Sequence, residues 1–168
     1  MCSGKSTLGE ALARALHSEF IDLDDYIERS RKRTIADIFS TEGETAFRQI
    51  ENTALDEILT RCGGTDAVIA LGGGTPCRPG VMDKLNSVAL TVHLTTTVER
   101  FVERLMLGGD KRPLATGKDA RELTDMVEEM LKLRNPFYNM ASATFDSTYL
   151  EDEKQVTESV TAFIKSLL

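Results

Sequence analysis

The feature that most restricts the fold of this sequence is the run Gly4-Lys5-Ser6-Thr7, which leads directly into a stretch with helical spacing of apolar residues. It matches the end of the phosphate-binding pattern G-x-x-x-x-G-K-[S/T], in which N–H groups at a helix N-terminus curl around a phosphate. In that pattern Lys5 reaches the β- and γ-phosphates, and Ser6 ligates Mg²⁺. The alternative is an ordinary helix start, with Ser3 as the cap and Lys5 in solvent.

Composition limits the class of protein. The chain has 168 residues, of which 41% are apolar, and we expect one globular domain over 1–168. The net charge of −7 argues against a nucleic-acid partner. Three cysteines without a C-x-x-C motif indicate neither a disulfide framework nor a zinc site, which favours a reducing cytoplasm. No apolar stretch reaches about 18 residues, so we expect no membrane span.

Stretches of helical and strand-like spacing alternate along the chain. The expected strands are 19–22, 67–71, 87–94 and 143–146. The expected helices are 5–17, 23–31, a short turn at 34–39, 43–62, 79–85, 97–107, 120–133 and 152–168, with a Gly-containing lid at 108–118. This alternation predicts an α/β fold in which helices cover both faces of a parallel sheet.

Two carboxylates, Asp22 and Asp24, follow the first expected strand. Ligands of open α/β sheets bind at the carboxyl ends of the strands, so both side chains can face one crevice. One carboxylate can hold Mg²⁺ through water, and the other can accept a hydrogen bond from a substrate hydroxyl. Alternatively, either aspartate caps the helix that follows.

A second candidate site element is Gly72-Gly73-Gly74, directly after the strand at 67–71. Three glycines permit unusual φ values and leave no side chain between the backbone amides and a ligand. Arg48, Arg112 and Arg134 stand in distinctive local sequences and can bind carboxylate or phosphate groups bidentately, although each alone is as easily a surface charge.

Taken in order, these motifs resemble the shikimate kinase family. The residues that carry the resemblance run from the P-loop end to the last arginine motif: Gly4-Lys5-Ser6-Thr7, Asp22-Leu23-Asp24-Asp25-Tyr26-Ile27-Glu28, Ile35-Ala36-Asp37-Ile38-Phe39, Gly43-Glu44, Phe47-Arg48, Glu51, Gly72-Gly73-Gly74, Arg112-Pro113-Leu114 and Arg134-Asn135-Pro136-Phe137-Tyr138. The resemblance implies a three-layer α/β/α P-loop kinase fold. It also implies transfer of the γ-phosphate of ATP to the 3-hydroxyl of shikimate, as part of aromatic amino-acid (chorismate) biosynthesis.

The resemblance also implies roles for individual residues. The catalytic residues would be Lys5, Asp24 and Arg112, with Arg112 closing over the transferred phosphoryl group from the lid. Shikimate would be bound by Asp24, Arg48, Gly72, Gly73, Gly74 and Arg134, with Phe39 and Phe47 lining the ring pocket. ATP would be bound by Ser3, Gly4, Lys5, Ser6, Thr7, Arg104 and Arg112, with 146–148 near the adenine. Mg²⁺ would be held by Ser6 and, through water, by Asp22.

The family fold also implies a strand before the P-loop, in the middle of a five-stranded parallel sheet ordered 2-3-1-4-5. In this chain that strand and the opening glycine of the loop would precede Met1. Three explanations stay open: a misassigned start or trimmed chain, which we favour, a strand supplied by another segment, or a truncation that no longer catalyses. The functional alternatives are therefore a non-catalytic shikimate kinase-like domain or another small-molecule kinase, such as a gluconate kinase. The family is commonly monomeric.

Overall fold

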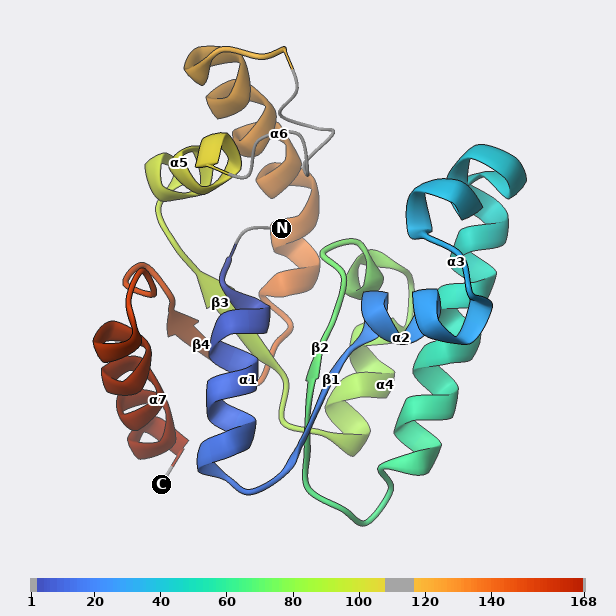
Figure 1. The fold of residues 1–168 in the computed structure, drawn as a ribbon, viewed down its shortest axis with the longest axis horizontal. Helices are drawn as coiled ribbons and strands as arrows, with labels where there is room; N and C mark the ends of the chain where they lie inside the picture. Colours follow the sequence, from blue (N-terminus) through green and yellow to red (C-terminus); the bar gives the residue numbers. More distant parts are fainter. Residues whose placement is uncertain (1–2, 108–116, 168) are drawn as a thin grey trace.

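The computed structural model describes residues 3–107 and 117–167 and contains two pairs of parallel strands surrounded by helices (Figure 1). Strand β1 (Glu19–Asp22) pairs with β2 (Ala67–Ala70), and β3 (Val92–Thr95) pairs with β4 (Ala143–Asp146). The helices are α1 (Lys5–Ala15), α2 (Leu23–Arg31), α3 (Ile35–Arg61), α4 (Val81–Val88), α5 (Val98–Leu107), α6 (Ala120–Tyr138) and α7 (Glu153–Leu167), with a 3-10 turn η1 (Thr75–Cys77).

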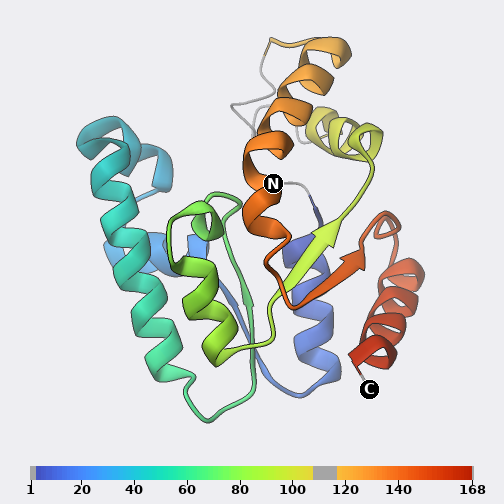
Figure 2. The same cartoon turned by 180° about the vertical axis from the view of Figure 1, so that it is seen from behind.

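Helices cover both faces of the strands, which gives three layers (Figures 1 and 2). On one face, Leu8 and Leu12 of α1 pack with Val160 and Phe163 of α7. On the other face, Leu55 of α3 packs with three buried residues of α4. These two apolar layers explain why the strands carry apolar residues without strict alternation, and they confirm the α/β/α class.

The strands are arranged as expected for the order 2-3-1-4-5 without its first strand. The strand pairs β1-β2 and β3-β4 are separate, and within residues 3–107 and 117–167 no strand joins β2 to β3. The two pairs correspond to positions 2-3 and 4-5 of the expected order. The α1–α7 cluster continues across the gap, since Val68 of β2 and Val92 of β3 both pack against it. Side-chain packing on α1 therefore holds the two halves in place of a shared ladder.

The break expected between the helices at 34–39 and 43–62 is present within α3, at Gly43, where φ is 80° and ψ is 175°. Two other expected boundaries were wrong. The strand expected at 87–94 begins at Val92, because α4 continues through Val88. Helix α6 runs past Leu133 and through Pro136 to Tyr138. In α6, the hydroxyl of Tyr138 donates to the carbonyl of Gly73 at 2.7 Å, so a tertiary contact extends the helix beyond its local signals.

Leu23 is the buried side chain between the two aspartates, and its replacement measures how much the apolar core near them contributes to stability. It is fully buried in the cluster around Ile21, Ile27 and Ile58. We expect Leu23→Ala to lower the free energy of unfolding by about 2–5 kcal/mol, because it leaves a cavity in that cluster. Urea denaturation measures the change. The control Leu133→Ala removes an exposed leucine and should stay within about 0.5 kcal/mol; equal losses would contradict the assignment.

Candidate active site

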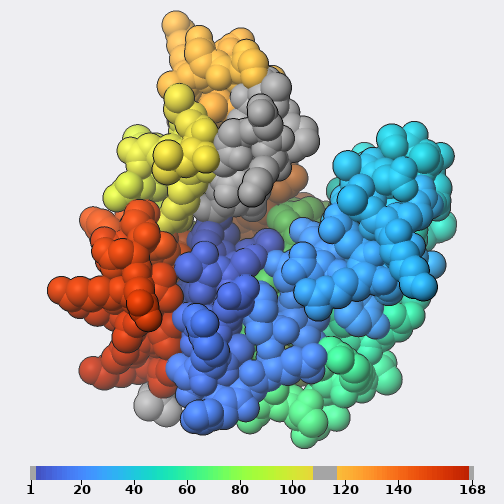
Figure 3. All heavy atoms as spheres, in the orientation of Figure 1, coloured from blue at the N-terminus to red at the C-terminus, as the bar shows by residue number. Residues whose placement is uncertain are grey.

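The predicted site residues gather where the strands end. The parallel register places Asp22 of β1 beside Ala70 of β2, so the segments that follow both strands start at one edge. Figure 3 shows the surface hollowed above this edge, between the side formed by α2 and α3 and the side formed by α5 and α6. This is the position expected for ligands of an open α/β sheet.

The Lys5–Ser6–Asp22 contacts connect the P-loop end to the first strand. The Lys5 ammonium lies 3.3 Å from Asp22 Oδ2, and the Ser6 hydroxyl donates to the same oxygen at 2.9 Å. Gly4 is the N-cap of α1 with a left-handed φ of 81°, and no side chain caps the helix. The alternative of a Ser3 cap and a solvated Lys5 is therefore wrong. Thr7 lies exposed on the first turn of α1.

Asp22 also caps the helix that follows it, as one interpretation of the sequence predicts. Its Oδ1 accepts a hydrogen bond from the backbone N–H of Asp24 at 3.0 Å, which caps α2. Its Oδ2 faces Lys5 and Ser6. The capping interpretation of the sequence is thus correct for Oδ1, while Oδ2 lies on the side of the P-loop end, where the predicted Mg²⁺ role stays a prediction.

Asp24 is a partly buried carboxylate whose pKa is shifted by its surroundings. Burial raises its pKa above the ordinary value; Lys5 opposes this shift, while Asp22 and Glu51 add to it. A carboxylate with a raised pKa is a stronger proton acceptor than an exposed one, and it lies against the glycine turn, where a substrate hydroxyl is expected.

The glycine turn is explained by close packing. None of Gly72, Gly73 and Gly74 has a positive φ, so the expectation of unusual backbone angles was wrong. A Cβ added at Gly72 would lie 3.2 Å from Asp24 Oδ1, and one at Gly74 would lie 3.1 Å from Arg48 Nη2. Glycine is favoured at these two positions because Thr75 Oγ1, Asp24 Oδ1 and the Arg48 guanidinium lie so close that a Cβ would force them to shift.

Glu51 was not among the predicted site residues, yet it lies at the centre of this site. It is 1% exposed, and its Oε1 accepts a hydrogen bond from the Thr75 hydroxyl at 2.7 Å. Its Oε2 lies 3.2 Å from Arg48 Nη1 and 3.6 Å from Arg78 Nη2. The available sequence signal was its spacing, because Arg48 and Glu51 are three residues apart on one helix and so share a face.

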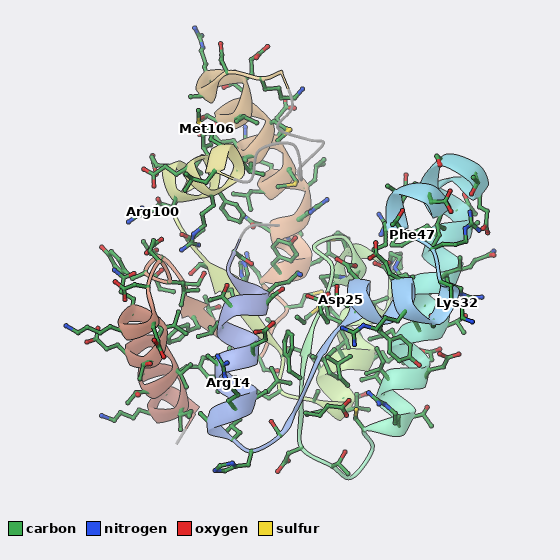
Figure 4. The ribbon with its side chains drawn as sticks, in the orientation of Figure 1. Arg14, Asp25, Lys32, Phe47, Arg100 and Met106 are labelled. Carbon is green, nitrogen blue, oxygen red and sulfur yellow. The ribbon has the colours of Figure 1, made fainter. Side chains whose placement is uncertain are left out.

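Arg48 and the two phenylalanines come from both sides of the break in α3. The left-handed φ at Gly43 lets Phe39 fold back onto Phe47, with ring centroids 4.5 Å apart. Phe47 lies in the part of α3 that rises beside the hollow (Figure 4), and Arg48 Cζ is 5.4 Å from its ring centroid. Burial lowers the pKa of Arg48, but bonds to Glu44 and Glu51 outweigh it and the net shift is upward. Arg48 stays charged.

Arg134 joins the same site through Cys77 and Tyr138. Burial raises the pKa of the Cys77 thiol, and the nearby charges of Arg134 and Arg48 oppose that shift. Burial likewise raises the pKa of Tyr138, against the opposing effect of Arg134. Tyr138, which belongs to the last arginine motif but had no predicted role, donates to the Gly73 carbonyl. The structure thus brings the two predicted carboxylate-binding arginines to one turn.

Arg104 lies apart from these groups, beside the segment after β4. Its Nη2 is 3.0 Å from the carbonyl oxygens of Ser147 and Thr148, and it pairs with Glu151 at 3.1 Å. The buried Ser147 hydroxyl lies 2.7 Å from the Ser3 carbonyl, which ties this segment to the P-loop end. Arg104 and residues 146–148 therefore meet as expected. Arg112 and most of the expected lid lie outside the described residues.

No helix in the described ranges is long and apolar enough to cross a membrane. The same ranges contain no group of three or more His, Cys, Asp or Glu side chains arranged to hold a metal. The Mg²⁺ expectation rests instead on a hydroxyl and a carboxylate. Mg²⁺ in kinases takes one or two protein oxygens and otherwise water and phosphate, so the adjacent Ser6 and Asp22 fit this ion.

The contribution of the buried Glu51 carboxylate to stability can be compared with that of the exposed Glu44 carboxylate. Glu51→Gln keeps the side-chain shape but leaves Arg48 and Arg78 without their shared carboxylate, so we expect a loss of about 1–3 kcal/mol in the free energy of unfolding. Glu44→Gln removes the exposed partner of Arg48 and should cost less than about 0.5 kcal/mol. Urea denaturation of both variants measures the two losses. A loss for Glu44→Gln as large as that for Glu51→Gln would contradict the greater contribution of the buried carboxylate.

The sequence matches a family model described as shikimate kinase over residues 1–165. A shikimate kinase of Bacteroides fragilis is 40% identical over 167 residues, which cover 99% of this chain and 92% of the relative. A shikimate kinase of Parabacteroides distasonis is 39% identical, again over 99% of this chain and over 95% of the relative.

Solved structures agree with the sequence relatives. The crystal structure of shikimate kinase from Bacteroides thetaiotaomicron superposes with a TM-score of 0.93 at 37% identity, covering 99% of this chain and 93% of that one. Shikimate kinase from Acinetobacter baumannii in complex with shikimate has a TM-score of 0.82 at 29% identity, covering 99% and 88%. With the P-loop end, the paired aspartates and the glycine turn in one site, this chain belongs to the shikimate kinase family of ATP-dependent kinases.

Proposed function

We propose that this chain transfers the γ-phosphate of ATP to the 3-hydroxyl of shikimate, with Asp24 as the group that receives the hydrogen bond of that hydroxyl. The observation that carries the proposal is the position of Asp24. It lies against Gly72, on the same side as the Lys5–Ser6–Asp22 contacts. A hydroxyl held there faces both a proton acceptor and the phosphate-binding helix end.

The nucleotide side consists of Ser3, Gly4, Lys5, Ser6 and Thr7. Lys5 supplies a positive charge for the β- and γ-phosphates, and the N-terminus of α1 supplies N–H groups. Bound Mg²⁺ neutralises the developing charge of the phosphates. Ser6 would hold that ion directly and Asp22 through water, which requires Asp22 Oδ2 to exchange its present bonds for ligand contacts. Arg104, with residues 146–148, is proposed for the adenine end.

The acid side of shikimate is assigned to Arg48 and Arg134. The charges of both arginines act on the Cys77 thiol beside the turn, and guanidinium groups bind carboxylates bidentately. Gly72, Gly73 and Gly74 offer backbone contacts, and Phe39 and Phe47 offer an apolar wall. Arg112 is proposed to meet the transferred phosphoryl group.

Catalysis of phosphoryl transfer depends mainly on positioning the two substrates and on stabilising the charge of the transferred group. The proposed residues provide both, and no covalent intermediate is needed. We further propose a single domain that acts as a monomer in the cytoplasm. The family relationship and the small number of cysteines, which form no C-x-x-C motif, support this proposal.

Asp24 gives the direct test of function. We expect Mg-ATP and shikimate together to release ADP with the unsubstituted chain, and Asp24→Asn to reduce that turnover at least about a hundredfold while ATP affinity stays unchanged. Asp25→Asn is the matched control, because Asp25 is exposed on α2 (Figure 4) and should keep full turnover. ADP release that does not respond to shikimate in the unsubstituted chain would refute the proposal.

Cys77 reports on substrate binding without turnover. Its thiol lies beside the Gly73 carbonyl, 3.5 Å away, near both arginines. Because burial raises its pKa, alkylation by iodoacetamide should increase with pH later than that of an ordinary thiol. Saturating shikimate should slow it at least about fivefold by covering the site. Cys62, at the far end of α3, is the internal control, and peptide mass spectrometry follows both; equal effects of shikimate on both thiols would argue against this pocket.

A further inference from the structure

Arg78 is a second arginine on the buried carboxylate of Glu51, and neither the motifs nor the proposed roles use it. It follows η1 directly, and its side chain is 17% exposed. Its Nη2 lies 3.6 Å from Glu51 Oε2, and its Nη1 donates to the backbone carbonyl of Arg48 at 3.3 Å. Arg78 therefore contacts both members of the Arg48–Glu51 pair.

The charges in this group explain what Arg78 adds. Glu51 carries one negative charge, and with Arg48 alone the pair would be neutral toward an approaching carboxylate. With Arg78 included, the three side chains carry one net positive charge. Glu44, the other partner of Arg48, has a side chain that is 69% exposed, so water screens it far more than it screens Glu51.

The remaining contacts of Arg78 indicate that its charge matters more than its hydrogen bonds. Its Nε and Nη2 are buried, and in the described ranges neither has a hydrogen-bond partner. Burying donors unsatisfied is unfavourable, so the favourable contribution of this side chain comes from its ion pair and its bond to the Arg48 carbonyl. The hydrogen bond acts on Arg48, the residue assigned to the substrate carboxylate, and the ion pair acts on Glu51, its partner.

We propose that Arg78 is a positioning residue for the carboxylate of shikimate: it neutralises Glu51, so that the charge of Arg48 stays available to the substrate. The inference rests on the proposed function. The competing explanation is a purely structural brace between the glycine turn and α3. The two differ in one respect, because only the first depends on the charge of the ligand.

The experiment compares shikimate with its methyl ester, which lacks the negative charge. For Arg78→Met we expect the dissociation constant of shikimate to rise about fivefold to tenfold, and those of the ester and ATP to change less than about twofold. Arg78→Lys keeps the charge and should bind shikimate within about twofold of the unsubstituted chain. Isothermal titration calorimetry gives all three constants, and Arg78→Gln replaces the methionine variant if that variant does not fold.

A double variant tests the sign of the effect. Arg78→Met combined with Glu51→Gln should bind shikimate more tightly than Arg78→Met alone, because the unpaired negative charge is gone. Equal weakening of shikimate and ester, no weakening at all, or a double variant that binds no better than Arg78→Met would each overturn the inference. Absence of shikimate binding by the unsubstituted chain would instead refute the proposed function, so the two failures are distinct.

Discussion

The buried carboxylate of Glu51 is the interaction on which the site depends. Its two oxygens hold three groups from two segments: the Thr75 hydroxyl, the Arg48 guanidinium and the Arg78 guanidinium. A buried charge is stable only when such partners surround it, so the turn after β2 and the helix α3 must come together for either to be correctly placed. The glycines follow from this, because Gly72 and Gly74 lie where Asp24, Glu51 and Arg48 leave no room for a side chain.

The arrangement of the two strand pairs depends on helix packing. Two strand pairs without a shared ladder remain side by side because both rest on one apolar cluster of α1 and α7. The P-loop end connects to both pairs: Lys5 and Ser6 contact Asp22 at the end of β1, and the carbonyl of Ser3 accepts a hydrogen bond from Ser147 after β4. The first turn of α1 thus links the two halves chemically as well as spatially.

Much of this could be predicted from sequence, for physical reasons that differ between elements. The α/β class and most helices follow from spacing, and the aspartates and arginines follow from ordered motifs. The break at Gly43 was predicted as the gap between two helices, but the extension of α6 to Tyr138 was not, since it depends on a contact with the distant Gly73. Arg78 was missed because a single arginine before a proline carries no pattern. Of the two reasons given for the glycines, the unusual φ values were wrong, and the close approach of distant side chains could not be seen in the local sequence.

One carboxylate contacts the starts of two helices. Asp22 caps α2 through Oδ1, next to Asp24, while its Oδ2 contacts Lys5 and Ser6 at the start of α1. If a phosphate draws Lys5 or Ser6 away from Asp22, the restraint on the first turn of α2 changes as well. Nucleotide affinity and acceptor affinity would then be coupled, and thermodynamic linkage requires each ligand to alter the binding of the other by the same factor.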